Sequence, residues 1–297
     1  MKQTNHGRLM LILSMAVFGT LAPFVRHIPL TSGELALGRA VLAAGLIALY
    51  LLITGQKIPL HGLKKELLLL LLSGAAMGIN WILLFEAYKY TSVSIATLSY
   101  YFAPVIVTAA CPLLFREMLT GRQILCFAMS TLGLALITLS GGLSGGRDLI
   151  GILLGLGAAS FYAAVILLNK FIRQIEGIHR TLLQFLAAIL VLTPYVALTK
   201  GFCWPVMNLS GWASLLTVGL IHTGVTYCLY FSALKELPGQ TAAILSYIDP
   251  LVAVVISVCL LGEPITFRQL LGGCMILGFT LLNELAPRPQ PQRAQTQ

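Results

Sequence analysis

Ten apolar segments of about 20 residues each constrain the fold of this 297-residue chain more than any other feature. An α-helix needs about 20 mostly apolar residues to cross the hydrocarbon core of a bilayer. The composition agrees, because only 10% of the residues are charged, whereas soluble domains carry about 25% charged residues. We therefore expect an all-α membrane protein with ten transmembrane helices. The expected spans are roughly 9–28, 34–54, 66–88, 91–115, 120–140, 149–171, 179–199, 211–234, 239–261 and 267–286.

The distribution of Lys and Arg predicts the orientation of these spans. An even number of spans places both termini on one side of the membrane, and that side receives thirteen of the nineteen Lys and Arg residues. Cytoplasmic loops carry such an excess in membrane proteins. We therefore expect a multi-pass protein of the bacterial inner membrane with both termini in the cytoplasm. The same rule accounts for the net charge of +9, so no binding to nucleic acid is expected.

An internal repeat relates residues 85–125 to residues 231–271. The two segments align without a gap at an offset of 146, with twelve identities in 41 positions, among them Pro104 with Pro250. Each copy then contains five spans, and because five is odd, the second copy enters the membrane from the opposite side. This pattern predicts two inverted five-helix repeats around a central cavity, which is a transporter architecture. The expected units are residues 1–145, residues 146–286 and a disordered C-terminal tail at 287–297.

The repeated motifs resemble a known family. The stretch "NWILLFEAYKYTSVSIATLSYYFAPVIV" with "FREMLTGRQ", and its counterpart "YFSALKELPGQTAAILSYIDPLVAVV" with "LGEPITFRQLLGGCMILG", are similar to the EamA-type branch of the drug/metabolite transporter superfamily. The opening "AVFGTLAPFVRHIPL" matches as well, although Phe18 stands where that family often has Trp. The resemblance implies ten helices, a central cavity and export of small metabolites, often amino acids. It does not identify the substrate.

Asp249 is the first candidate functional residue. A charged side chain at the centre of a membrane helix costs about 2.5–3.5 kcal/mol on insertion scales, and Asp249 lies about halfway along an apolar run, directly before Pro250. A proline breaks the backbone hydrogen bonding of a helix, which is tolerated where the freed groups line a cavity or find partners. The first repeat has the proline but Ala103 in place of the acid. This asymmetry favours function over architecture for Asp249; a carboxyl group that locks helix packing is the alternative.

His222 lies at a similar depth in the preceding span, and the first repeat has Ala76 at that position. Asp249 and His222 could share a proton or bind a substrate amine, and we expect such a pair to titrate near physiological pH. A structural histidine is the alternative interpretation. Whether the two side chains face each other does not follow from the sequence.

Aromatic and amide side chains are candidates for lining a solute cavity. Some aromatic residues occupy matched positions in the two repeats, and others lie at similar depth. Core packing or an interfacial aromatic belt is the alternative for the aromatic residues, and a bond between helices for the amide. The candidates are Trp81 with Tyr227, Tyr101 with Tyr247, and also Tyr100, Tyr162, Tyr230 and Asn80.

Arg39 lies five residues inside the second expected span, which begins at Glu34. Binding of a carboxylate is one interpretation. Its place near the end of a span favours snorkelling to the membrane surface or pairing with Glu34.

Together these features favour a secondary transporter for a small amphipathic solute, with no cofactor, no metal and no catalytic residue. Two alternatives remain open. A polytopic membrane enzyme acting on a lipid or peptide is disfavoured because "GLSGG" at 142–146 lacks the strand that precedes a nucleophile elbow. A passive channel would need repeated polar rings, and the sequence contains no clear sign of them.

Overall fold

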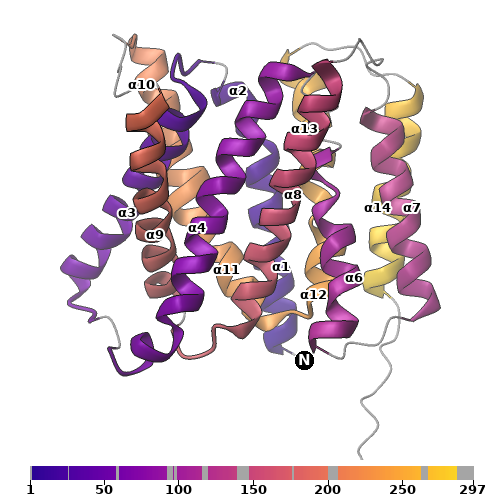
Figure 1. Ribbon diagram of the computed structural model, residues 1–297. Coiled ribbons are helices and arrows are strands. Elements are labelled where there is room, and N and C mark those ends of the chain that lie inside the picture. The colour runs from indigo at the N-terminus through magenta and orange to yellow at the C-terminus, as the bar shows by residue number, and fades with distance from the viewer. Residues whose placement is uncertain are drawn as a thin grey trace, which may run out of the picture.

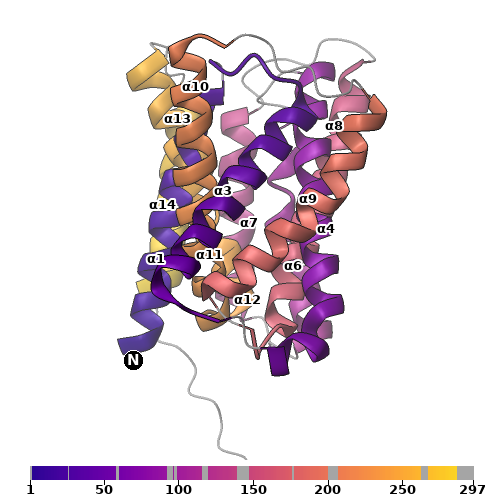
Figure 2. The same cartoon turned by 90° about the vertical axis from the view of Figure 1, so that its left-hand side faces the viewer.

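The computed structural model of the chain describes residues 2–25, 27–57, 60–91, 96, 99–115, 120–138, 147–175, 177–199, 207–261 and 267–285. Every regular element within these ranges is a helix, and the helices lie side by side (Figures 1 and 2). The first half of the chain contains α1 (Lys2–Gly19), α2 (Leu21–Val25), α3 (Ser32–Thr54), α4 (Leu60–Tyr90), α6 (Ala103–Phe115) and α7 (Gly121–Thr138). The second half contains α8 (Arg147–Phe171), α9 (Gly177–Thr199), α10 (Leu209–Leu216), the π-helix η2 (Thr217–Val225), α11 (Thr226–Glu236), α12 (Gly239–Leu245), α13 (Ile248–Leu261) and α14 (Phe267–Leu285).

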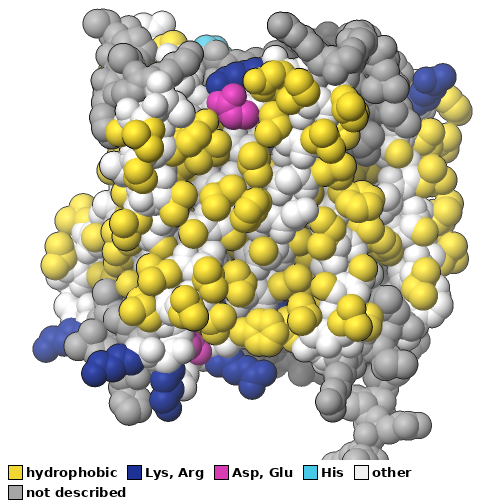
Figure 3. Space-filling model, in the orientation of Figure 1, with side chains coloured by type: hydrophobic (Ala, Val, Ile, Leu, Met, Phe, Trp, Pro, Cys, Tyr) yellow, Lys and Arg dark blue, Asp and Glu magenta, His cyan; other side chains and the backbone are white. Residues whose placement is uncertain are grey.

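The surface of the bundle is apolar, as expected for a protein that lies in lipid. Yellow apolar side chains cover the middle of the face in Figure 3, and Lys and Arg gather at its lower edge. Leu113 and Leu198 are each 86% exposed. These features confirm the prediction of an all-helical membrane protein. Within the described ranges, the helices long and apolar enough to span a membrane number six, covering Asn5–Val25, Ser32–Thr54, Lys64–Tyr90, Leu149–Phe171, Gly177–Thr199 and Leu209–Glu236.

The span expected at 239–261 is not one continuous helix. The chain leaves α12 at Leu245, makes a turn at residues 246–247 and enters α13 at Ile248. In the first repeat, α6 likewise starts at Ala103 after a turn at residues 101–102. Pro104 and Pro250 therefore lie in the first turn of a short helix, where a missing backbone N–H costs little. The predicted interruption is present, a few residues before the proline.

Helices of the two halves pack in reciprocal pairs. The element α4 packs along α8 and α9, while its counterpart, the continuous segment α10–η2–α11, packs along α1 and α3. Two counterparts pack directly on each other in two other cases, α3 with α9 and α7 with α14. The helices α7 and α14 stand together at one edge of the bundle (Figure 1). The two halves are thus interleaved and share one core.

A glycine permits the close approach of α4 to α9. A Cβ atom at Gly74 would lie 2.3 Å from the backbone oxygen of Gln184 and 2.5 Å from the Cβ of Ala187. Small residues let helices pack closely in a membrane, where there is little hydrophobic force between them. The G-x-x-x-G pair Gly74 and Gly78 therefore lies at a contact between the two halves.

Candidate functional site

Asp249 occupies the first turn of the half-helix α13 and is partly exposed. The N-terminus of a helix carries unpaired N–H groups and a partial positive charge, which favours a nearby carboxylate. Discontinuous helices present such ends near the midplane in many transporters. The hydroxyl of Tyr101 lies near the Asp249 carboxyl group.

A series of aromatic rings begins at this tyrosine. Tyr101 packs edge-on against Tyr100, with ring centroids 5.4 Å apart. Tyr100 stacks on Tyr162 at 5.3 Å, with 18° between the ring planes. The hydroxyl of Tyr230 then donates to that of Tyr162 over 3.1 Å. The rings come from both halves of the chain, so the series crosses between the repeats.

The series continues from Tyr230 to a buried cation. Tyr230 packs edge-on against Tyr227, with centroids 6.0 Å apart. The indole N–H of Trp81 donates to the hydroxyl of Tyr227 over 3.2 Å. The Cζ of Arg39 lies 4.5 Å from the centroid of the Trp81 ring, within the range of a cation–π contact. We call these residues, from Asp249 through the five tyrosines and Trp81 to Arg39, the aromatic series. The aromatic series has the carboxyl group of Asp249 at one end and the guanidinium of Arg39 at the other.

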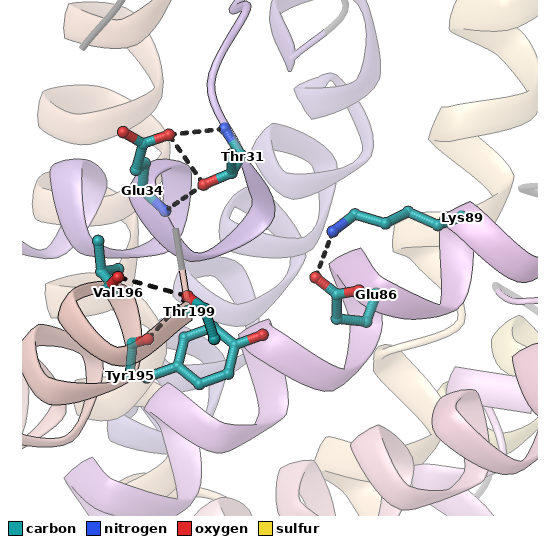
Figure 4. Close-up of polar contacts among 7 residues, drawn as sticks. All are labelled: Thr31, Glu34, Glu86, Lys89, Tyr195, Val196 and Thr199. Atoms are coloured by element: carbon teal, nitrogen blue, oxygen red, sulfur yellow. Dashed lines mark hydrogen bonds and ion pairs between the residues drawn. The ribbon is translucent and has the colours of Figure 1, made fainter. Parts of the chain in front are cut away.

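Arg39 is neither at the membrane surface nor paired with Glu34, so the interpretation that its position favoured is wrong. Its side chain is 3% exposed, and its Nε donates to Thr223 Oγ1 over 2.9 Å. Thr223 lies in the middle of a span, 14 residues after Leu209 and 13 before Glu236. Glu34 instead forms a capping box with Thr31 at the start of α3 (Figure 4). The distance of Arg39 from the nearest end of its span gave the wrong depth for its guanidinium, because the side chain reaches a residue at mid-depth of another helix.

His222 has partners of its own. Its Nε2 lies 2.9 Å from Thr20 Oγ1, and its Nδ1 lies 3.3 Å from the carbonyl oxygen of Thr217. Thr20 Oγ1 also lies 2.7 Å from the carbonyl oxygen of Val17. A Cβ at Gly19 would lie 2.6 Å from the backbone oxygen of Asp249. The ring of His222 and the backbone of Asp249 thus both lie against the junction of α1 and α2, but no hydrogen bond or ion pair between the two side chains is found in the part of the chain that the structure describes.

Two further candidates form other contacts between helices, although Tyr247 shares one buried apolar cluster with Tyr101. Tyr247 is fully buried, and its hydroxyl is 2.6 Å from that of Thr131. Asn80 is 3% exposed and donates to the carbonyl of Ala158 over 2.6 Å, which ties α4 to α8. The structure therefore brings Trp81, Tyr227, Tyr100, Tyr101 and Tyr162 together with Asp249, and it places Tyr247 and Asn80 in contacts between helices.

The π-helix η2 was not anticipated from the sequence. Side chains within it bond to carbonyls five residues back, as Thr223 does to Val218 and His222 to Thr217. π-Helical segments occur frequently at functional sites. The partners Thr20 and Thr223 were also missed. Their only signal in the sequence is that a threonine directly follows His222 in the middle of a span.

Comparison with known proteins identifies the family. The EamA-like transporter family matches residues 5–139 and again residues 149–284. The chain belongs to the EamA-like transporter family. This membership confirms the resemblance found in the repeated motifs, and it makes the protein a transporter built from two EamA repeats.

Individual relatives agree with the family. The chain is 30% identical over 280 residues to the uncharacterized transporter YxxF of Bacillus subtilis (strain 168), covering 93% of this chain and 88% of the relative. It is 30% identical over 148 residues to the threonine/homoserine exporter RhtA of Salmonella typhimurium (strain SL1344), covering 49% of this chain and 48% of that protein. A crystal structure of a protein that is 16% identical superimposes with a TM-score of 0.81, covering 94% of this chain and 98% of the other. That last likeness concerns the fold alone.

Proposed function

We propose that this EamA-family transporter exports a small metabolite, an amino acid or a related amphipathic solute, by alternating access. The observation that carries the proposal is the aromatic series, in which a carboxyl group at a broken helix and a buried guanidinium are joined by rings from both repeats. Aromatic rings suit the apolar part of such a solute, and charged groups suit its polar part. The partial match to a threonine/homoserine exporter supports an amino acid as the solute.

The proposed architecture is two inverted five-helix repeats, residues 1–145 and 146–286, around a central cavity. The reciprocal packing of the two halves and the two separate family matches support this arrangement. Each repeat would adopt in turn the conformation that its counterpart has left. The protein would lie in the bacterial inner membrane with both termini in the cytoplasm, because its Lys and Arg are concentrated on that side.

The proposed coupling group is Asp249, with His222 as a second titrating group in contact with the same junction of α1 and α2. An intramembrane carboxyl group near the midplane is a frequent proton carrier in transporters. The Tyr101 hydroxyl would hold the carboxyl group in place in one protonation state, and the solute would compete for it in the other.

Transport by the purified protein in liposomes tests the proposal. We expect uptake of labelled amino acids to saturate, to be accelerated by unlabelled solute on the opposite side, and to return the solute unchanged. Flux that does not saturate and shows no counter-exchange would indicate a channel, and a chemically altered solute would indicate an enzyme.

Cysteine labelling tests the inverted topology. Lys89 and Lys235 are matched positions near the ends of α4 and α11. In a chain whose native cysteines are replaced, a membrane-impermeant thiol reagent should reach Lys89→Cys and Lys235→Cys from opposite sides. Labelling of both from the same side would refute the inverted arrangement.

A further inference from the structure

The guanidinium of Arg39 is held on one face and one edge. Thr223 accepts from its Nε, and the ring of Trp81 lies against the group at 4.5 Å. An arginine has five N–H donors, and these two contacts use one donor and one face. Among the residues that the structure describes, no acidic side chain forms an ion pair with Arg39. The two terminal amino groups are therefore available to a ligand.

A second buried arginine differs in its surroundings. Arg180 is fully buried, and its Nε donates to the carbonyl of Ile175 over 3.1 Å. One of its terminal amino groups donates to the side-chain oxygen of Asn169 over 3.3 Å. These contacts tie together α8, α9 and the connection between them, as expected of a structural arginine. Arg39 has no carbonyl acceptor among its described contacts.

The surroundings of Arg39 suit a solute with an apolar part. Trp81, Tyr227 and Phe185 pack on one another, with centroids 5.6 to 6.3 Å apart. From Arg39 toward Asp249, each ring of the aromatic series contacts the next. Aromatic surface therefore lies between the cation and the acid.

We propose that Arg39 binds the carboxylate of the transported solute, so that the substrates are carboxylate-bearing compounds whose apolar part packs on Trp81 and Tyr227. This inference rests on the proposed function and adds the substrate class and the residue that selects it. Arginine presents two parallel N–H donors to a carboxylate, and such charge-assisted pairs are strong away from water. Thr223 and Trp81 fix the orientation of the fork before the solute arrives, which lowers the entropy lost on binding.

The test uses the full-length protein in liposomes with the twenty proteinogenic amino acids as labelled probes. Each transported amino acid is then compared with its amide, which keeps the side chain but lacks the carboxylate. We expect the wild-type protein to prefer the acid by about 10- to 100-fold in KM, the worth of a charged hydrogen bond. Arg39→Gln should raise KM for the acid by a similar factor and remove the preference, and Arg39→Lys should restore part of it. Arg173→Gln, at an exposed arginine, is the control for loss of a positive charge.

The outcomes separate this inference from the proposed function. If the wild-type protein takes up the amide as well as the acid, the inference is overturned. This comparison needs no variant, so the inference can be tested even if Arg39→Gln fails to fold. An unchanged KM in Arg39→Gln also overturns it, while saturable transport still upholds the proposed function. If the wild-type protein transports none of the twenty amino acids, the proposed amino acid export fails, and the inference fails with it.

Discussion

Replacing Gly74 by alanine probes the contact between α4 and α9, on which the interleaving of the two repeats depends. The added Cβ would lie 2.3 Å from the backbone oxygen of Gln184, and real Cβ atoms essentially never come within 3.0 Å of another heavy atom. The neighbour is backbone, so it cannot turn away as a flexible side chain can. The helices must separate, and overpacking of this kind typically costs about 1–3 kcal/mol.

Two other glycines provide matched controls for this substitution. Gly45, in the middle of α3, has no atom within 4 Å of the position that a Cβ would take, so Gly45→Ala should not destabilise the protein and should gain about 0.5–1 kcal/mol from the higher helix propensity of alanine. At Gly78 the nearest atom, the backbone oxygen of Ala188, is 3.3 Å away, and we expect an intermediate effect.

The assay is the melting temperature of each detergent-purified variant, followed by the loss of the monodisperse peak in size-exclusion chromatography after heating. The expected order of stability is Gly45→Ala, then Gly78→Ala, then Gly74→Ala, with the last several degrees below the wild-type protein. If the melting temperature of Gly74→Ala equals that of the wild-type protein, α4 and α9 do not approach each other as closely as in the structure. The interleaved arrangement of the two repeats would then lose its main support.

Three further predictions concern single groups. Asp249→Asn, which keeps the shape of the side chain, should abolish the pH dependence of transport in liposomes and leave the melting temperature close to that of the wild-type protein; retained pH dependence would rule out Asp249 as the coupling group. The Glu66 carboxylate accepts from three successive backbone N–H groups at residues 173–175. Glu66→Ala should therefore lower the free energy of unfolding by about 2–3 kcal/mol, measured by thermal or denaturant unfolding. Its control is Glu86→Ala, which removes a partly exposed i,i+3 ion pair with Lys89 and should change the free energy of unfolding little. Trp81→Phe and Tyr227→Phe each remove one side of a 3.2 Å hydrogen bond, and a double-mutant cycle of stability should give a coupling of about 0.5–1.5 kcal/mol; strict additivity would contradict the contact.

The sequence was informative where one physical rule dominates. Apolar length and low charge predicted the membrane helices, and the repeated prolines Pro104 and Pro250 predicted where two of them are interrupted. The matched pair Trp81 and Tyr227, recognised from the offset of the repeat, lies in direct contact. Residues at equivalent positions can meet when two copies pack on each other, so aligning the repeats is enough to single out this pair.

The sequence was least informative for side chains whose partners come from a distant helix. The position of Arg39 near the end of its own span indicated the membrane surface, but Thr223, 184 residues away, holds the guanidinium at mid-depth. His222 had a plausible partner in Asp249 at the same depth, yet its ring contacts Thr20. Depth along a helix can be read from a sequence, whereas the direction in which a side chain leaves the helix depends on packing and, here, on the changed register of a π-helix.

The aromatic series combines a symmetric frame with asymmetric charges, and this combination bears on mechanism. Trp81 and Tyr227 are counterparts in the two repeats, so their contact can persist as the repeats exchange conformations. Asp249, by contrast, has Ala103 as its counterpart. A charged group that is present in one repeat and absent from the other lies in a different environment in each conformation. A ligand or proton can shift a conformational equilibrium only through such a difference in affinity between the two states. In the mechanism that we propose, coupling would therefore act at Asp249, and the aromatic rings shared by the two repeats would hold the solute while the repeats move.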